Sequence, residues 1–542
     1  MTARFRPHLP AFALACLLTL AWSVSDWGNL AALRLPDTDD AMRLQQVRDW
    51  LAGQGFGDLR QYRLGGGLLM HWSRIGDLVP AALIALLAPS LGQHDAELAA
   101  VIAWPLAQFA AFLALVAAIA RRLTPEAAMP ALVLAALAYP ATTLFMPGRI
   151  DHHGLQLILV LVQLHALLAA PGWRSGAVAG FAIALGAAIG LETLPFALVT
   201  GGMILLGWWQ GTANAAERQR GFGAALALAT LLLLPIAGSG GGCDTVRPLA
   251  LPAIIGALAL VGLSFARPRW WLVALAAALA SGAAALTAGA CLAGPYGAVD
   301  PLVARLWLAH VGEAQSLLAA PLANAIAYAG LLLAGTLAGV ALVWRRGGGW
   351  TLVFAFQVAS LLLTLTQLRG AYIGAALAAV PIAAVLALWL AGAGLVYPTL
   401  ASALVAPSRD TAAPSCTTPP ALARLAALPP GVIMAPIDLG AFTIAATRHS
   451  AVAAPYHRND VGNAVMYRFF LGPPGQAREI AVRWNVRYVA LCPGAFAETG
   501  ELRPEAIAGG ARPAWLVPTT PPNSVPMIFT IDRRLLETGD AR

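Results

Sequence analysis

A short acidic motif follows the first apolar run of this 542-residue chain. Asp37, Asp39 and Asp40 fall within four positions in the stretch "RLPDTDDAM". Like charges this close repel one another unless a cation neutralises them, and carboxylate oxygens are ligands that divalent metals prefer. Aspartate is also favoured in the first turn of a helix, so a solvated acidic helix start explains the same pattern. The motif alone leaves both interpretations open.

A second polar motif, "GRIDHH", stands between two apolar runs, where ionisable groups are costly. Asp151 and His153 lie two residues apart, a spacing that can turn a carboxylate and an imidazole toward one ion. Arg149 is near enough to meet an anion. Asp151 can also cap the helix that follows, with the histidines at the membrane interface, and capping is compatible with ligation. We expect His152 to be only a neighbour of this site.

Two single charges mark later loops. Glu313 stands in "HVGEAQ" and, taken alone, is an ordinary loop residue. Arg369, in "LTQLRGAY", lies at the outward end of an apolar run, where arginine is disfavoured. An arginine kept there indicates an anionic partner such as a phosphate, although snorkelling to lipid phosphate is the alternative. Glu192 is a further carboxylate at a membrane edge, and the sequence suggests no partner for it.

The composition shows which elements must position these residues. The chain is 59% hydrophobic and 11% charged, which is too apolar for a soluble protein of this length. Apolar runs long enough to cross a bilayer recur through the first 400 positions, so we expect an all-α polytopic membrane bundle. The expected helices are 9–31, 97–120, 127–146, 154–170, 175–192, 195–209, 222–238, 249–266, 270–291, 322–344, 350–367 and 371–396.

The sequence predicts 12 or 13 membrane spans. A short thirteenth span within "GAGLVYPTLASALVA" would place the C-terminal tail outside, whereas twelve spans would leave it in the cytoplasm. The run at 78–89 is too short to span and is expected to lie at the interface. Arginine pairs stand at alternate loops, which the positive-inside rule places in the cytoplasm. The loops that carry the polar motifs are therefore predicted to face outward. Because the basic residues are spread over helix ends, the formal charge of +8 indicates membrane topology and not nucleic-acid binding.

The composition changes near residue 407. We therefore divide the chain into a transmembrane domain, 1–406, with a long first outward loop at 34–95, and a soluble domain, 407–542. Strand-like and helical runs alternate in the tail, which predicts a small α/β fold. Cys416 and Cys492 bracket this tail and can pair in an oxidising compartment, which favours an outward position. Cys16, Cys243 and Cys291 are expected to be buried apolar residues.

Taken in order, these motifs resemble those of GT-C membrane glycosyltransferases, and most of all the single-subunit oligosaccharyltransferases. The resemblance implies transfer of a sugar or oligosaccharide from a polyprenyl-(di)phosphate donor to an acceptor, with inversion, at the outer face of the bacterial inner membrane. The acceptor, whether protein, lipid or glycan, is not identified by the motifs. A lipid groove between helices and a divalent cation, Mg²⁺ or Mn²⁺, are also implied.

The resemblance also assigns roles to individual residues. Asp40, beside Asp39, takes the place of the catalytic aspartate of the first loop. Asp151 and His153 match the second metal motif, and "HVGEAQ" resembles the short motif that carries the family's glutamate. The metal ligands implied are Asp40, Asp151, His153 and Glu313, and Arg369 resembles the arginine that meets the lipid pyrophosphate.

The tail departs from the family pattern. It lacks the Trp-Trp-Asp sequence that reads a protein sequon in oligosaccharyltransferases, and carries "TRHSAVAAPYHRNDVGN" in a polar stretch. We expect His457, Arg458 and Asn459, together with Asp39, to contact an acceptor or a donor head group.

Two other functions were weighed. An ion-coupled membrane transporter would show charges near the bilayer midplane and broken helices in paired halves, and the sequence shows neither. A noncatalytic lipid-glycan binder would tolerate the loss of the metal residues.

Overall fold

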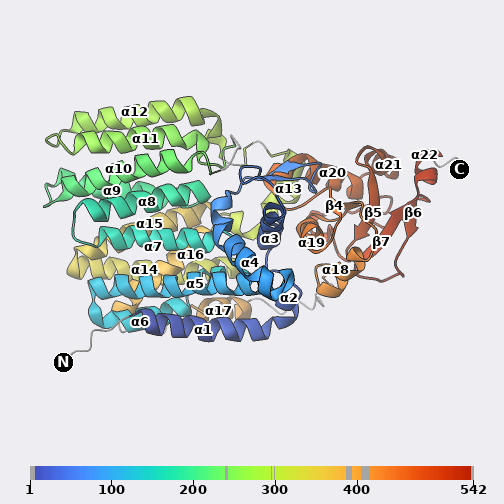
Figure 1. The fold of residues 1–542 in the computed structure, drawn as a ribbon, viewed down its shortest axis with the longest axis horizontal. Coiled ribbons are helices and arrows are strands. Elements are labelled where there is room, and N and C mark those ends of the chain that lie inside the picture. The colour runs from blue at the N-terminus through green and yellow to red at the C-terminus, as the bar shows by residue number, and fades with distance from the viewer. Residues whose placement is uncertain are drawn as a thin grey trace.

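A bundle of roughly parallel helices forms one end of the molecule, and a smaller region that contains a sheet forms the other (Figure 1). The structure is a computed structural model, and it describes residues 7–237, 242–294, 296–297, 299–385, 394–404 and 415–538. The bundle helices are α1 (His8–Ser25), α5 (Gln93–Leu123), α6 (Ala128–Ala136), α7 (His153–Leu167), α8 (Trp173–Ile189), α9 (Leu194–Trp209), α10 (Ala215–Leu233), α11 (Arg247–Leu263), α12 (Trp270–Ala288), α14 (Leu322–Arg346), α15 (Gly349–Thr366) and α16 (Gly370–Ala384). Each one corresponds to a helix expected from the sequence.

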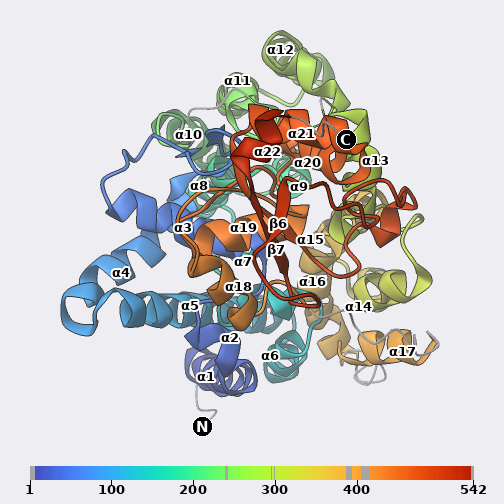
Figure 2. The ribbon, with the colours of Figure 1, turned by 90° about the vertical axis from the view of Figure 1, so that its right-hand side faces the viewer.

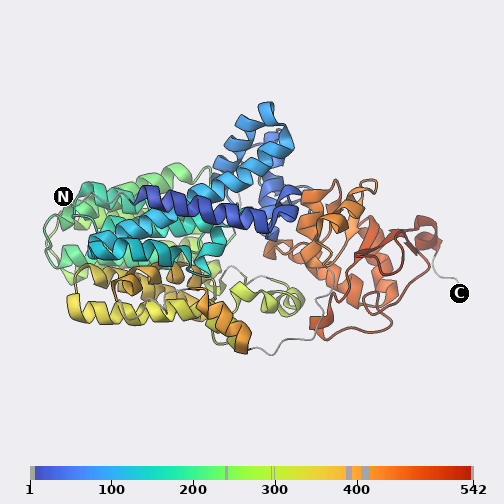
Figure 3. The ribbon, with the colours of Figure 1, turned by 90° about the horizontal axis from the view of Figure 1, so that it is seen from below.

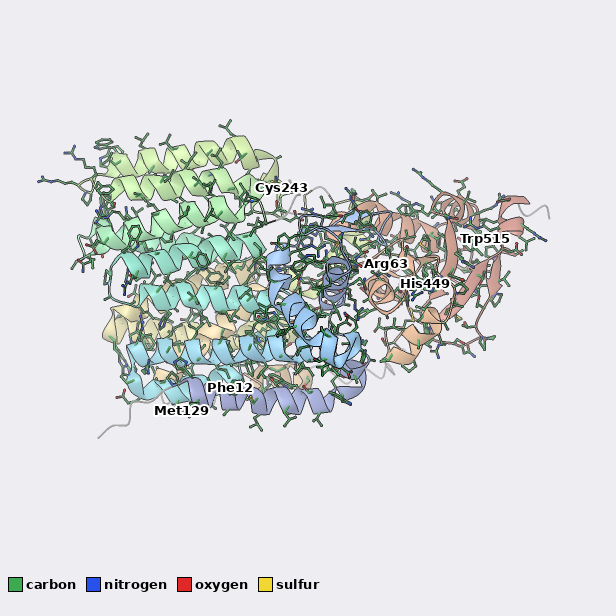
Figure 4. All side chains as sticks on the ribbon, in the orientation of Figure 1. Phe12, Arg63, Met129, Cys243, His449 and Trp515 are labelled. Carbon is green, nitrogen blue, oxygen red and sulfur yellow. A yellow bond between two sulfur atoms is a disulfide. The ribbon has the colours of Figure 1, made fainter. Side chains whose placement is uncertain are left out.

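The outer surface of the bundle is apolar, as lipid contact requires. Within the described part of the chain, six helices are long and apolar enough to span a bilayer, and shorter apolar helices pack among them. Phe12 and Met129 illustrate this surface, since both project outward from the bundle (Figure 4). The chain is a multi-pass membrane protein, and the predicted all-α membrane bundle is confirmed.

Several elements differ from their expected bounds. Helix α10 begins at Ala215 and not at 222, and the helix expected at 371–396 is described as α16 only to Ala384, since residues 386–393 lie outside the described residues. The helix expected at 127–146 ends at Ala136, because the chain turns at Tyr139 and Pro140 and continues as the 3-10 helix η3 (Ala141–Phe145). The run expected at 78–89 belongs to a longer element, in which η1 (Arg74–Asp77) leads directly into α4 (Leu78–Leu91). This element is 18 residues long and apolar enough to span, but α4 is steeply inclined to the bundle helices (Figure 3).

The first outward loop forms a small unit at the end of the bundle. It contains α3 (Thr38–Leu51) and the short hairpin of β1 (Arg60–Gln61) and β2 (Leu68–Leu69). It follows α2 (Trp27–Ala31), because the helix expected at 9–31 is divided into α1 and α2. Asp37 caps α3, since its Oδ1 accepts a hydrogen bond from the backbone N–H of Asp39 at 3.3 Å. The acidic motif therefore begins a helix, as the simpler interpretation expected.

Several short elements connect the later helices. They are η4 (Gly289–Ala293), α13 (Pro301–Leu306), η5 (Leu308–His310) and η6 (Gly312–Ala314). Helix α17 (Val396–Leu404) lies in the stretch that was expected to hide a thirteenth span, and residues 386–393 and 405–414 on either side lie outside the described residues.

The C-terminal region is built on a five-stranded sheet with the order β4-β3-β5-β7-β6. The strands are β3 (Val432–Met434), β4 (Ser450–Ala451), β5 (Val486–Leu491), β6 (Leu516–Pro518) and β7 (Met527–Ile531). Strand β3 pairs in parallel with β4 and β5, whereas β7 is antiparallel to β5 and β6. Helices α18 (Pro419–Ala426), α19 (Ile437–Ala446), α20 (Asp460–Leu471), α21 (Pro474–Arg483) and α22 (Arg533–Thr538) surround this sheet (Figure 2). The predicted small α/β fold is confirmed.

The first outward loop fastens the two ends of the molecule together. Nη1 of Arg63 donates to the backbone carbonyl of Thr447 at 2.8 Å, close to His449 at the junction (Figure 4). Nη1 of Arg48 likewise donates to the carbonyl of Ala445 at 2.7 Å. Tyr456 Oη donates to the carbonyl of Thr38 at 2.9 Å, so α3 is held directly against the C-terminal region.

Two disulfides lie on this side of the bundle. Cys416 and Cys492 are bonded to each other, as their positions allowed. Cys243 and Cys291 form a second disulfide, so the expectation that they are buried apolar residues was wrong. They lie in different outward loops, which the packing of α11 against α12 brings together, and sequence spacing does not reveal this contact. Cys16 is a free cysteine in α1.

Candidate functional site

A cavity of about 740 Å³ lies where the outward ends of α9, α11, α12 and α15 meet the first loop and the C-terminal region. Its bundle side is apolar and includes Leu194, Leu249, Ala285 and Leu363. The ionisable side chains that line the rest are Asp39, His71, His152, His153, Glu192, Asp244, Glu313, Arg369 and His457. Six separate loops and the C-terminal region therefore contribute charge to one cavity.

Arg149 joins the first and second motifs. Its Nη1 lies 2.9 Å from Oδ2 of Asp37 and 3.1 Å from Oδ2 of Asp40, and its Nη2 lies 2.8 Å from Oδ2 of Asp151. A guanidinium has enough donors to bind several carboxylates at once. The two motifs thus meet, as their resemblance predicted, and Arg149 contacts carboxylates where the sequence suggested an anion from the donor.

Asp40 is turned away from the cavity. Its carboxylate is completely buried, and its Oδ1 accepts hydrogen bonds from the backbone N–H groups of Ile150 at 2.8 Å and Asp151 at 2.9 Å. Burial, together with the neighbouring carboxylates of Asp151 and Asp37, raises the pKa of Asp40 to about 8 in spite of Arg149. The side chain fixes the second loop against α3.

Asp39, the adjacent residue, lines the cavity. Burial raises the pKa of Asp39 well above its usual value, and the carboxylates of Asp37, Asp151, Glu313 and Asp40 raise it further. Carboxylates from three different loops are therefore close enough to repel one another, which is the condition that a bound cation relieves.

Asp151 stands just before α7, which begins at His153 with His152 as its N-cap. Oδ1 of Asp151 accepts from the backbone N–H of His153 at 3.0 Å, so Asp151 satisfies a free N–H at the start of the helix without being its N-cap residue. The imidazole of His153 faces the cavity, and its Nδ1 lies 3.3 Å from Oε1 of Gln156. This hydrogen bond leaves the imidazole itself available for a ligand.

Glu192, for which the sequence offered no partner, contacts this second loop. Its Oε2 accepts from Nε2 of Gln156 at 2.7 Å, and its Oε1 lies 3.4 Å from Nε2 of His152. His152, His153 and Glu192 each offer a ligand atom within 4.8 Å of the others. Sequence reasoning missed this group because Glu192 follows α8 and is about 40 residues away, so only the packing of α7 against α8 brings it here.

Glu313 and Arg369 form a pair in the wall of the cavity, close to His153 and Glu192. Nη2 of Arg369 lies 3.1 Å from Oε1 of Glu313 and 3.4 Å from Oη of Tyr296. The backbone N–H of Arg369 also donates to the carbonyl of Glu313 at 3.1 Å. Two motifs that are 56 residues apart in the sequence thus act as one unit.

The polar stretch of the C-terminal region divides in two. His457 lines the cavity, and its Nε2 lies 2.7 Å from Oδ2 of Asp244. Arg458 grips both oxygens of Asp244, with Nε donating to Oδ2 at 2.8 Å. Asn459 is buried in the interior, where its Nδ2 donates to Val452 and Asn463 at 3.0 Å each.

His71, Asp244 and His457 make a second group whose ligand atoms lie within 4.8 Å of one another. The guanidinium of Arg458 occupies both carboxylate oxygens of Asp244, so a cation is already in place beside this carboxylate. The contact closes one end of the cavity by holding the C-terminal region to the loop that carries the Cys243–Cys291 disulfide.

No family model matches the sequence, and no curated protein matches it either. The fold does match solved structures. The archaeal oligosaccharyltransferase AglB of Archaeoglobus fulgidus, in complex with an inhibitory peptide and a dolichol-phosphate, aligns with a TM-score of 0.64 and 15% identity, over 89% of this chain and 69% of that one.

Two further structures of the Archaeoglobus fulgidus oligosaccharyltransferase align equally widely. Its apo form gives a TM-score of 0.61 at 15% identity, over 90% of this chain and 70% of that one. Its complex with Zn and sulfate gives 0.59 at 16% identity, over 89% and 67%. The chain therefore has an oligosaccharyltransferase-like GT-C fold, as the resemblance of its motifs predicted.

Proposed function

We propose that this chain is a metal-dependent, inverting glycosyltransferase. It transfers a sugar or oligosaccharide from a polyprenyl-(di)phosphate donor to an acceptor at the outer face of the bacterial inner membrane. One observation carries the proposal: in an oligosaccharyltransferase-like fold, the motifs of four separate outward loops converge on one cavity with an apolar wall. An ion-coupled transporter does not require the motifs of these loops to converge on one cavity.

The residues fit a divalent cation, Mg²⁺ or Mn²⁺. We assign Asp151, His153 and Glu313 as the oxygen and nitrogen ligands, with one aspartate from the first loop. Asp151 does not line the cavity and its Oδ2 is held by Arg149, so its Oδ1, which accepts from the backbone N–H of His153, is the atom that would bind the cation. We favour Asp39 for this position, because Asp39 lines the cavity whereas Asp40 is committed to the backbone and to Arg149. When bound, the cation stabilises the negative charge that develops on the leaving phosphate.

The cavity has an apolar wall and a charged wall, and a polyprenyl-linked donor fits both. The apolar wall, with Leu194, Leu249 and Leu363, accommodates the start of the polyprenyl chain. Arg369 is the phosphate contact, since its guanidinium lines the cavity and already binds an anionic partner in Glu313. We assign Arg149 the task of neutralising the carboxylates behind the site, a task that leaves it less free to meet the donor directly.

The transfer step needs a nucleophile on the acceptor and a base. The acceptor attacks the anomeric carbon opposite the phosphate, so the new bond to that carbon forms as its bond to the phosphate oxygen breaks. The acceptor proton passes to a cavity carboxylate, Asp39 or Glu313, and the phosphate leaves on its polyprenyl chain. Attack from the opposite side inverts the configuration. His457 also lines the cavity, and we assign it a contact with the acceptor or the sugar.

The compartment follows from the same arrangement. Two disulfides on the cavity side, Cys243–Cys291 and Cys416–Cys492, suit an oxidising compartment such as the periplasm. We therefore propose that residues 407–542 form a periplasmic domain over the transmembrane domain, 1–406, and that the cavity opens on that side.

The test uses lipid-linked glycans extracted from the host, labelled in the sugar, and the purified full chain. Asp151→Ala is expected to lower transfer to host acceptors by at least about a hundredfold, and EDTA to lower wild-type transfer equally. Asp95→Ala, which changes an exposed carboxylate at the start of α5, serves as the matched control. Undiminished transfer by Asp151→Ala would contradict the metal site. Binding of the glycan lipid without any transfer by the wild type would favour a noncatalytic binder.

A further inference from the structure

A chain of partly buried hydrogen bonds joins His153 to Gln156 and to Glu192, a carboxylate that also lines the cavity. Nδ1 of His153 lies 3.3 Å from Oε1 of Gln156, and Nε2 of Gln156 donates to Oε2 of Glu192 at 2.7 Å. Gln156 is buried, and it lies one turn after His153 on α7. Neither Gln156 nor Glu192 belongs to the four motifs that the sequence singled out.

The chemistry of these partners fixes the state of the imidazole. A carboxylate only accepts hydrogen bonds, so the amino group of Gln156 must face Glu192 and its carbonyl oxygen must face His153. An amide oxygen also only accepts, so Nδ1 of His153 carries the proton. Nε2 is then the nitrogen of His153 that is left for a ligand, and it binds a metal when the imidazole is neutral.

Glu192 is held in turn by His152. Nη2 of Arg43 lies 3.0 Å from Nδ1 of His152, and a guanidinium only donates, so this nitrogen accepts. The proton of His152 is then on Nε2, which lies 3.4 Å from Oε1 of Glu192. Nη1 of Arg43 binds Oδ1 of Asp77 at 2.8 Å, and both side chains are buried. Both ring nitrogens of His152 are occupied, which leaves His153 as the histidine that can ligate.

The backbone is shaped to admit these groups. Gly190 ends α8 beside Glu192, and it has no side chain at the point where Gln156 and Glu192 meet. A Cβ atom added at Gly190 would overlap Oε2 of Glu192 and would lie 2.8 Å from Nε2 of Gln156. The flexible ends of these two side chains would have to move apart.

We infer that Gln156 and Glu192 are positioning residues, which act through hydrogen bonds to set the tautomer and direction of the His153 imidazole toward the bound cation. The inference rests on the proposed function, because the cation is part of that proposal. Partners of this kind, one step behind the ligands, typically change metal affinity by about 10- to 100-fold when they are removed.

The experiment measures Mn²⁺ binding to the purified full chain by electron paramagnetic resonance, without donor or acceptor. Gln156→Leu removes both hydrogen bonds and keeps the volume, and we expect it to weaken Mn²⁺ binding by about 10- to 100-fold. Gly190→Ala removes no polar group, but its added Cβ pushes the side chains of Gln156 and Glu192 apart. We therefore expect it also to weaken Mn²⁺ binding. Echo modulation from a directly bound imidazole nitrogen should be present in the wild type and absent in His153→Ala.

The matched control is Gln163→Leu. Gln163 is also a buried amide on α7, and its Oε1 accepts from Thr200 at 3.0 Å, away from the cavity. Its loss costs stability without changing Mn²⁺ affinity, and the unfolding midpoint of each variant separates the two effects. If Gln156→Leu and Gly190→Ala bind Mn²⁺ like Gln163→Leu, while Asp151→Ala and His153→Ala bind it weakly, the positioning role is wrong and the cation site stands. If Asp151→Ala and His153→Ala also bind Mn²⁺ normally, both proposals fail.

Discussion

Two groups of charged side chains lie on either side of the second outward loop, and they differ in whether all of their charges are held in ion pairs. Behind the loop, Arg149 binds Asp37, Asp40 and Asp151 in a closed set of ion pairs. In front of it, Asp39, His153, Glu313 and Arg369 line a cavity, and Glu313 there is 37% exposed whereas Asp40 and Asp151 are almost fully buried. We interpret Arg149, Asp37 and Asp40 as a structural joint, whereas the open group has charge to offer to a ligand. Asp151 belongs to both groups, since its Oδ2 binds Arg149 and its Oδ1 accepts from the backbone N–H of His153. The same residue types therefore serve stability on one side and binding on the other.

The largest effect on stability is expected at the closed group. Arg149→Met leaves three carboxylates without their cation, and two of these, Asp40 and Asp151, are almost fully buried. Breaking a buried ion pair in this way typically costs about 3–5 kcal/mol of unfolding free energy. Denaturant unfolding in detergent measures this loss. A variant as stable as the wild type would show that the closed group is not a joint.

At the open group we expect a small loss of stability and a large loss of transfer. Arg369→Met leaves Glu313, which is 37% exposed and can be hydrated, so the expected loss of unfolding free energy is only about 1 kcal/mol. Transfer should fall by about 10²- to 10³-fold, because a charge that contacts the leaving phosphate is lost. The transfer assay and the unfolding curve are read on the same preparation. A large loss of stability with normal transfer would contradict the assignment of Arg369 to donor binding.

Asp39 and Asp40 allow the sharpest contrast, since they are neighbours assigned to opposite groups. Asp39→Asn should weaken Mn²⁺ binding by about tenfold or more, because a charged oxygen ligand is replaced by a neutral one. Asp40→Asn should leave Mn²⁺ affinity within about threefold, since its Oδ1 accepts only from the backbone. Mn²⁺ titration followed by electron paramagnetic resonance compares them. The opposite ranking would make Asp40 the first-loop ligand, as the resemblance of the sequence implies.

Much of the fold was predictable from the sequence, because membrane spans are determined by the length and apolarity of each run. The end of α6 was not predicted, since the turn at Tyr139 and Pro140 lies inside an apolar run. The Cys243–Cys291 disulfide was missed for a related reason: both cysteines follow apolar segments, and only helix packing brings their loops together.

The site was predictable to the extent that each motif carries its own chemistry. Asp151, His153, Glu313 and Arg369 were singled out by residue type and position, and the structure brings them to one end of the bundle. Glu192, Gln156 and Asp244 were not assigned, because single polar residues in apolar surroundings show no pattern until a partner from another loop is known. Which of two adjacent carboxylates faces the cavity depends on the turn of α3, and spacing does not set this.

The central claim is that this protein uses a polyprenyl-linked sugar as its donor substrate. It can be tested without knowing the sugar or the acceptor. The measurement is mass spectrometry of the host's polyprenyl-(di)phosphate sugars in strains that carry the wild type, Asp151→Ala or Asp95→Ala in place of the chromosomal copy. We predict that one lipid-linked sugar accumulates in the Asp151→Ala strain, to the level seen when the whole gene is deleted, and not in the Asp95→Ala strain. Identical lipid-linked sugar pools in the deletion strain and the wild type would contradict the proposed function.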